Sequence, residues 1–233
     1  MNINIKFDDS SPTFALFNKI KTDILNGKLL PNEKLVIANL KKMYNVGVGP
    51  LREVLSMLVS LDLVYMEHQK GYRVAPLSLD DMEDIYASRI IIEIQTLKLS
   101  LENGDDYWEG NLMGAFHLLN KVEREIESKK FNLEEWKIRH NNFHNVLVSA
   151  CPLKTLLNIR LALWENFTRY RNLWIKTELN QNNTFLKTTS KEHQKILEIA
   201  LNRDIASITS IIETHFNHTL ESLRSIEKFE NLL

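Results

Sequence analysis

The chain has 233 residues, of which 44% are hydrophobic and 25% are charged, and its 29 Lys and Arg nearly balance 30 Asp and Glu. A single Cys excludes an intramolecular disulfide, and no uncharged apolar run approaches the roughly 18 residues that cross a bilayer. The N-terminal sequence MNINIKFDDSSP also lacks the apolar stretch of a secretory signal, so we expect a cytoplasmic protein with no membrane span.

Glycine and proline are unevenly distributed along the chain. Four of the seven glycines and four of the five prolines lie before residue 77, and Pro152 is the last of either kind after Gly114. Because these residues interrupt helices, the second half of the chain should be almost entirely helical. We therefore predict a mainly α protein with an N-terminal domain at residues 1–77 and a helical domain at residues 78–233.

The N-terminal domain has the element order of a winged helix-turn-helix. Ser11 and Pro12 are typical of a helix start, and the apolar face that follows ends at Asn26-Gly27. A second helix is predicted at 36–44 and a third, opened by Pro50, continues to about residue 60. Two short apolar segments around a Gly-containing turn, 63–67 and 72–75, predict a β-hairpin that would form the wing.

The C-terminal domain reads as an antiparallel helical bundle. Ser78 can cap its first helix, and Asp80 and Asp81 suit the positive end of the helix dipole. Breaks at short polar or proline-containing segments separate the helices, which we expect at 79–102, 106–128, 132–150, 153–177, 185–202 and 204–227.

The overall charge of −1 conceals a difference between the two predicted domains. Residues 1–77 contain 10 Lys and Arg against 7 Asp and Glu, a net of +3, whereas residues 78–233 contain 19 against 23, a net of −4. Basic side chains on a winged helix could contact DNA phosphates and bases, although ordinary surface charge is the alternative. The candidates on the helix-turn-helix and its wing are Lys41, Lys42, Arg52, His68, Lys70 and Arg73.

Histidines on three predicted helices share the apolar faces of those helices. His140 and His144 are four residues apart, so both lie on one helix face, while His193 and His215 lie on the apolar stripes of two later helices. Neutral imidazoles that converge in a bundle core are suited to zinc, nickel or a similar ion. The alternative is a set of buried histidines that are hydrogen-bonded to their neighbours.

Several motifs agree in order and spacing with one family. In the N-terminal domain they are Leu35, Leu40, Val46, Pro50–Leu55, Leu58, Leu63-Val64, Gly71 and Val74–Pro76, and in the helical domain they are Asp84–Arg89 and Glu93. The chain resembles the GntR family of bacterial transcription regulators, with an effector domain of the FadR type, called FCD. The resemblance spans nearly the whole chain.

The sequence departs from the family pattern where DNA is usually contacted. Gly47, Val48 and Gly49 stand where Ser-Arg-Thr is usual, and Asp62 replaces a glycine before the wing. Two hydroxyls and an arginine that commonly bind DNA are therefore missing. We expect the fold to persist but operator recognition to differ from the family norm.

The resemblance also implies a metal site and an effector site. Many FadR-type domains bind a metal through Asp-x-x-x-His and two later histidines; His144, His193 and His215 match those histidines, and His140 occupies the aspartate position. Four neutral imidazoles would favour zinc, with nickel as the alternative. The family further implies that Arg89 holds an effector carboxylate, although a salt bridge with Glu93 is the alternative, and Arg169 and Arg171 are weaker candidates for the same cavity.

We therefore predict a ligand-responsive transcription regulator, a repressor, that binds operator DNA as a homodimer and senses a small organic acid. Two alternatives stay open. The histidines could belong to a metal-dependent helical enzyme, although no nucleophile or carboxylate is placed beside them by a motif. Alternatively, the protein could bind ligands but have lost normal operator recognition. His68, His117 and His218 are predicted to lie outside the metal site.

Overall fold

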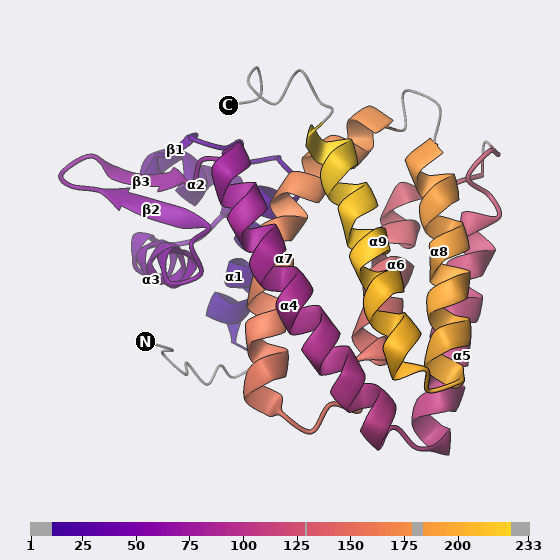
Figure 1. Cartoon of the computed structure of the whole chain (residues 1–233). Coiled ribbons are helices and arrows are strands. Elements are labelled where there is room, and N and C mark those ends of the chain that lie inside the picture. Colours follow the sequence, from indigo (N-terminus) through magenta and orange to yellow (C-terminus); the bar gives the residue numbers. More distant parts are fainter. Residues whose placement is uncertain (1–10, 129, 179–183, 225–233) are drawn as a thin grey trace. The chain divides into compact units, whose positions relative to one another are not determined.

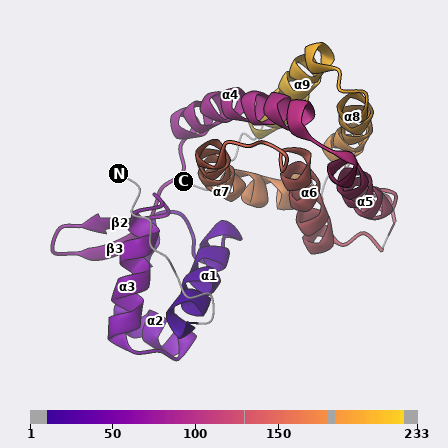
Figure 2. The same cartoon turned by 90° about the horizontal axis from the view of Figure 1, so that it is seen from below.

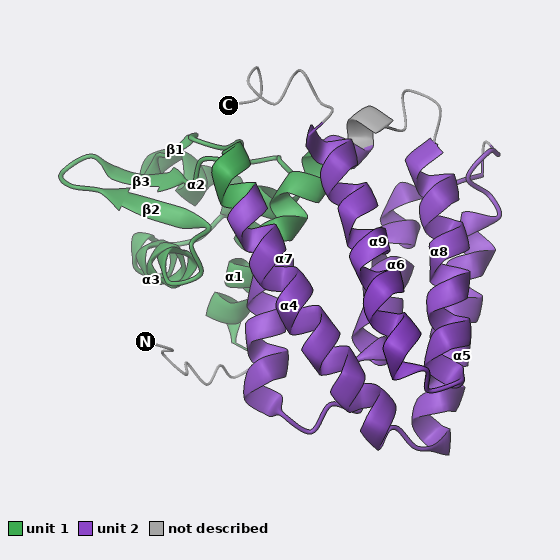
Figure 3. Cartoon of the chain, in the orientation of Figure 1, with its two compact units in different colours: residues 1–82, 165–173, 227–233 green, residues 83–164, 174–226 purple. Residues whose placement is uncertain are grey.

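The computed structural model describes residues 11–128, 130–178 and 184–224, and it contains helices and one small sheet (Figures 1 and 2). The described residues form two compact units, one of residues 11–82 and 165–173 and the other of residues 83–164 and 174–224 (Figure 3). The predicted mainly α fold, with an N-terminal winged helix-turn-helix and a C-terminal helical bundle, is confirmed. No helix among the described residues is long and apolar enough to span a membrane.

The first helix of the N-terminal unit, α1 (Pro12–Leu25), begins as the sequence predicts. The Ser11 hydroxyl accepts a hydrogen bond from the Phe14 amide at 3.1 Å, and Pro12 occupies the first turn, where its missing N–H costs nothing. The buried face of α1 packs against α3 (Val48–Val59), and α2 (Ile37–Tyr44) also contacts α3. One apolar core therefore joins the three helices.

The wing is a three-stranded antiparallel sheet in which the order is β1-β3-β2. The hairpin of β2 (Val64–Glu67) and β3 (Gly71–Val74) matches the predicted one, with Val64 opposite Val74 and Glu67 opposite Gly71. The short strand β1 (Lys34–Leu35), which the sequence analysis missed, pairs with β3. Because β1 has only two residues, it carries no readable period of alternating side chains.

The recognition helix α3 begins earlier than its proline suggests. Helical geometry starts at Val48, two residues before Pro50, and Gly47 is the residue that precedes the helix. Proline is compatible with this position because the first helical N–H groups have no partner within the helix. Gly47 has no side chain that could accept a hydrogen bond from the first turn, so the N-terminus of α3 has no side-chain cap.

The helical unit is built mainly from six helices whose order was predicted but whose ends were only approximate. They are α4 (Leu79–Asn103), α5 (Asp106–Glu123), α6 (Leu133–Leu147), α7 (Lys154–Glu178), α8 (Thr184–Leu201) and α9 (Ile205–Arg224). Within this unit α5 packs against α6 and α8, and α8 packs against α9. Helix α5 ends five residues before the predicted end, and turns with i to i−3 hydrogen bonds follow it. Residues 129, 179–183 and 225–227, where two breaks and one helix end were predicted, lie outside the described residues.

Helix α7 contributes to both units. Residues 165–173 cluster with the N-terminal unit, whereas residues 154–164 and 174–178 belong to the helical unit (Figure 3). Within the N-terminal unit, Lys21 pairs with Glu165 at 2.5 Å, and the Asn172 amide donates to the Leu25 carbonyl at 3.1 Å. The prediction of one division between residues 77 and 78 did not include the membership of residues 165–173 in the N-terminal unit.

Two glycines near the start of α5 should respond in opposite ways to the same substitution. A Cβ atom on Gly104 would lie 2.6 Å from Trp108 and 2.7 Å from Arg203, whereas a Cβ on Gly110 would meet no atom within 4 Å. Gly104→Ala should therefore destabilise the protein by about 1–3 kcal/mol through overpacking. Gly110→Ala, at an exposed helical position, should stabilise it by roughly 0.5–1 kcal/mol. Urea unfolding of both variants would test this pair, and equal shifts of the same sign would contradict it.

Candidate metal centre and nucleic-acid interface

The four predicted histidines converge in the helical unit. Helix α6 provides His140 and His144, α8 provides His193 and α9 provides His215, and their exposed fractions are 6, 2, 0 and 4%. One ring nitrogen from each lies within 4.8 Å of the corresponding nitrogen of every other member. The structure thus brings together all four residues that the sequence analysis named, and we call them the histidine cluster.

Aromatic side chains enclose the histidine cluster. Trp136 lies one helical turn before His140, with their ring centres 4.6 Å apart, and Trp164 of α7 lies 5.9 Å from His140 and 5.7 Å from His144. Phe143 packs edge-on against His144 and His193 at 5.4 and 5.5 Å. These rings keep water away from the imidazoles and limit their rotation.

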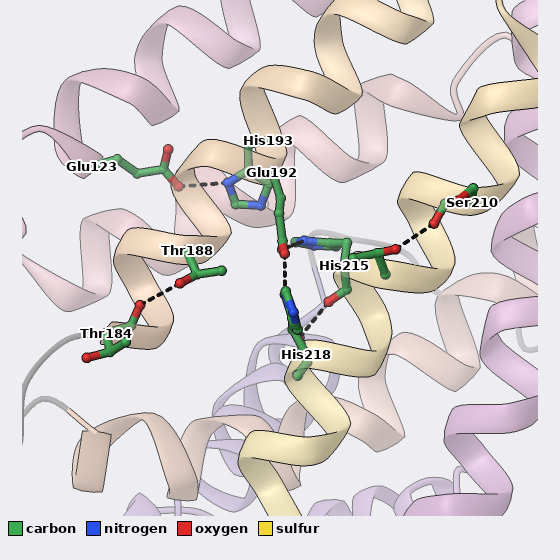
Figure 4. A network of polar contacts seen from close by, with 10 residues as sticks. Glu123, Thr184, Thr188, Glu192, His193, Ser210, His215 and His218 are labelled. Carbon is green, nitrogen blue, oxygen red and sulfur yellow. Dashed lines mark hydrogen bonds and ion pairs between the residues drawn. The ribbon is translucent and has the colours of Figure 1, made fainter.

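Two buried carboxylates determine which nitrogen of two histidines faces the cluster (Figure 4). The Nδ1 atom of His193 lies 2.7 Å from Glu123 Oε1, and the Nδ1 atom of His215 lies 2.8 Å from Glu192 Oε2. A carboxylate accepts a hydrogen bond, so each imidazole carries its proton on Nδ1 when it is neutral. The Nε2 atom of each ring is then left with a lone pair that can bind a metal.

The donor set of the cluster fits a metal ion. The Nε2 atoms of His144 and His193 are buried and have no hydrogen-bond partner in the structure, which a pair of purely structural histidines would normally avoid. Burial, reinforced by the neighbouring His140, lowers the pKa of His144 well below its usual value. Burial also lowers the pKa of His215, although Glu192 acts in the opposite direction. Both shifts favour the neutral imidazole, which is the form that ligates.

Arg89 of α4 is enclosed near the same helices. Its guanidinium carbon lies 4.3 Å from the ring centre of Trp164 and 4.4 Å from that of Phe216, and its Nη2 atom lies 3.6 Å from Glu93 Oε1. The contact with Glu93 matches the salt bridge considered from the sequence. Burial lowers the pKa of Arg89 to about 10, so the guanidinium stays positively charged at neutral pH.

Arg160 of α7 connects this region with the histidine cluster. Its Nε atom donates to Glu93 Oε2 at 2.7 Å, and its Nη2 atom donates to the backbone carbonyl of His144 at 3.0 Å. Glu93 therefore lies between two buried arginines, one of which also holds the backbone of α6. The sequence analysis did not identify Arg160, because no local spacing relates it to either partner.

The other two arginines predicted for the effector cavity belong to the N-terminal unit. Arg169 and Arg171 are buried on the part of α7 that clusters with the N-terminal unit. There Arg169 Nη1 donates to the Ala75 carbonyl at 3.5 Å, and its guanidinium packs beside the Tyr170 ring. The histidine cluster belongs to the helical unit, so we leave both arginines out of the effector site proposed below.

Three further polar groups lie beside the histidines, and the two carboxylates among them were not predicted. Glu123 ends α5, Glu192 directly precedes His193, and His218, predicted to be peripheral, has its Nδ1 atom against Glu192 Oε1. The side chain of His218 is 43% exposed, which agrees with a position at the edge of the cluster. No motif identifies Glu123, because its contact with His193 joins residues 70 positions apart.

On the N-terminal unit, five of the six predicted DNA-binding residues are exposed. Lys41 and Lys42 lie in the last turn of α2, Arg52 lies on the first half of α3, and His68 and Lys70 lie at the hairpin turn. Arg73 differs, because its guanidinium is bound to Glu67 at 2.9 Å and to the Asn32 carbonyl at 2.9 Å. Arg73 therefore stabilises the wing in this structure.

Comparisons with known proteins agree with the fold. Residues 14–74 match the family described as "Bacterial regulatory proteins, gntR family", and residues 84–218 match the FCD domain. The HTH-type transcriptional repressor GlaR of Escherichia coli (strain K12) is 38% identical over 197 residues, which cover 84% of this chain and 88% of that protein. BphR of Paraburkholderia xenovorans (strain LB400), an uncharacterized HTH-type transcriptional regulator, is 32% identical over 90% of this chain and 84% of that protein.

Solved structures show the same architecture. E. coli McbR/YncC has a TM-score of 0.76 at 17% identity, over 92% of this chain and 97% of that chain. At this identity the likeness concerns the fold alone, whereas the family assignment rests on the two matched domains and the curated relatives. The chain therefore belongs to the GntR family of bacterial regulatory proteins and is a transcription regulator with an FCD effector domain.

Proposed function

We propose that this regulator is a repressor that binds operator DNA in the cytoplasm and releases it in response to a small carboxylate. The observation that carries the proposal is the buried histidine cluster, which lies in the same unit as the buried cation of Arg89; among the described residues, the Nε2 atoms of His144 and His193 have no hydrogen-bond partner. A relative that is 38% identical is named as a repressor, which supports the direction of control.

His140, His144, His193 and His215 would hold the metal, with zinc proposed and nickel as the alternative. Imidazole nitrogen is a good ligand for these borderline ions, whereas magnesium and calcium prefer oxygen. When bound, the ion would supply positive charge to the effector and cross-link α6, α8 and α9. The matched relatives are transcription regulators, and we assign the metal no catalytic step.

Arg89 would bind the effector carboxylate. Two aromatic rings cover the guanidinium, and Glu93 Oε1 lies 3.6 Å from its Nη2 atom. A planar guanidinium can form two parallel hydrogen bonds with a carboxylate, and burial strengthens that pairing. The Arg160–Glu93 pair would then stabilise the remaining charge beside α6.

DNA would be bound by two winged helices in a homodimer, through Lys41, Lys42 and Arg52 and through His68 and Lys70 of the wing. Binding that rests on a net of +3 and lacks the usual arginine at position 48 should be weak, so that moderate salt abolishes it. Helix α7 offers a route for the effector signal. Trp164 contacts both His144 and Arg89, and Arg160 donates to the His144 carbonyl. The segment that follows, residues 165–173, belongs to the N-terminal unit.

Removal of one central histidine should abolish metal binding. His193→Ala takes away the ligand that is fully buried and hydrogen-bonded to Glu123. Mass spectrometry of purified protein should find zinc in the wild type and in His117→Ala, a control at an exposed position of α5, but not in His193→Ala. Unchanged zinc content in His193→Ala would refute the site. The same measurement on His140→Ala decides between three and four ligands.

Operator binding should depend on Arg52 and on ionic strength. Fluorescence anisotropy with DNA from the protein's own promoter should show affinity that falls steeply with salt, and Arg52→Ala should reduce the salt slope by about 1 if the side chain contacts phosphate. Lys28→Ala, which removes an exposed charge outside the helix-turn-helix, is the matched control. If the wild type does not bind at low salt, the alternative of a regulator without normal operator recognition is favoured.

Arg89 should be required for the response to carboxylates. Arg89→Lys keeps the charge but loses the planar pair of donors, so small carboxylic acids that raise the melting temperature of the wild type should no longer do so. Arg203→Lys is a suitable control, because Arg203 also packs on a tryptophan, with its guanidinium 4.6 Å from Trp108. Equal stabilisation of the wild type and Arg89→Lys by the same acids would argue against this role.

A further inference from the structure

Glu123 is an unusually placed carboxylate for a protein core. Its side chain is 1% exposed, its Oε1 atom accepts hydrogen bonds from His193 Nδ1 at 2.7 Å and from Trp136 Nε1 at 3.3 Å, and its Oε2 atom is buried without a hydrogen-bond partner in the structure (Figure 4). A buried carboxylate with an unpartnered oxygen is costly unless positive charge lies nearby. Its hydrogen-bond partners among the described residues are an indole and a histidine of the cluster.

The histidine cluster lacks the negative charge that a bound metal ion would require. Four neutral imidazoles provide no negative charge, so a divalent ion among them would bring two positive charges into a region from which water is excluded. A carboxylate hydrogen-bonded to the far nitrogen of a ligand can offset this charge, because it polarises the imidazole and makes the facing nitrogen more basic. Glu123 and Glu192 both have this position.

We propose that Glu123 is the main charge-compensating and positioning residue of the metal site, acting on the ion through His193. This inference rests on the metal site proposed above. Glu123 holds the imidazole of His193 in one tautomer and provides a negative charge in a medium of low dielectric constant, where the charge acts strongly. Trp136 fixes the carboxylate in turn, since its indole N–H donates to the same oxygen.

Glu192 has the weaker role of the two carboxylates. Its oxygens are divided between His215 and His218, and the latter side chain is 43% exposed. Part of its charge is therefore used by a histidine at the surface, where water screens the interaction. Among the described residues, Glu123 is hydrogen-bonded to one histidine, and that histidine is fully buried.

The test is a zinc titration of the metal-stripped full chain in competition with a chromophoric chelator. Glu123→Gln keeps the shape and one hydrogen-bond acceptor but removes the charge, so zinc affinity should fall by about 10- to 100-fold. Glu127→Gln is the matched control, because it makes the same change four residues later, in the turns that follow α5, where the exposed Glu127 pairs with Lys187. Its zinc affinity should equal that of the wild type. Unchanged affinity in Glu123→Gln would overturn the inference.

Thermal unfolding separates this role from simple packing. Bound zinc stabilises the folded state in proportion to the logarithm of its affinity, so Glu123→Gln should reduce the rise in melting temperature that zinc produces. If the substitution lowered the melting temperatures of metal-free and zinc-loaded protein equally, the role would be structural and the inference would be wrong.

A second background tests the importance of charge. His140→Asp places a carboxylate directly in the cluster, so Glu123→Gln should reduce zinc affinity less in His140→Asp than in the wild type. An equal reduction in both backgrounds would contradict charge compensation. If the wild type itself bound no zinc, the proposed metal site would fail along with this inference, whereas zinc binding that is insensitive to Glu123→Gln would remove this inference alone.

Discussion

The burial of four imidazoles against one another is the constraint on which the helical unit depends. Burial of the Nε2 atoms of His144 and His193, which have no hydrogen-bond partner among the described residues, does not stabilise a core by itself, because both atoms lose hydrogen bonds to water. Three helices nevertheless converge on the cluster, and aromatic rings and two carboxylates hold the imidazoles in place. This arrangement destabilises a core that holds no metal, but it forms a ligand set before the metal binds, because one ion would coordinate the buried nitrogen lone pairs together.

The same helices relate the cluster to the other parts of the regulator. Arg160 holds the backbone of His144 and the carboxylate of Glu93, which also faces Arg89. Trp164 covers both Arg89 and the histidines, and it is followed directly by the segment of α7 that belongs to the N-terminal unit. In the proposed function, an anion that binds to Arg89 would change the interactions of the buried charges of Arg89, Glu93 and Arg160.

Local patterns predicted the order of the helices and the position of the four histidines on the inner helix faces, because caps, glycine turns and helical periodicity act over a few residues. They did not predict strand β1, the early start of α3 at Val48, or the membership of residues 165–173 in the N-terminal unit. They also missed Glu123 and Arg160, whose partners lie 70 and 67 positions away. Arg169 and Arg171, the weaker candidates for the effector cavity, belong to the N-terminal unit, where Arg169 donates to the Ala75 carbonyl.

The proposed effector response and the proposed role of Glu123 both depend on the binding of a metal ion by the histidine cluster. Anomalous X-ray diffraction from crystals of the full chain, recorded on both sides of the zinc absorption edge, tests this claim most directly. We predict an anomalous peak between His140, His144, His193 and His215, next to the Nε2 atoms of His193 and His215. The absence of a peak there in zinc-soaked crystals, or a peak only at the surface, would contradict the account.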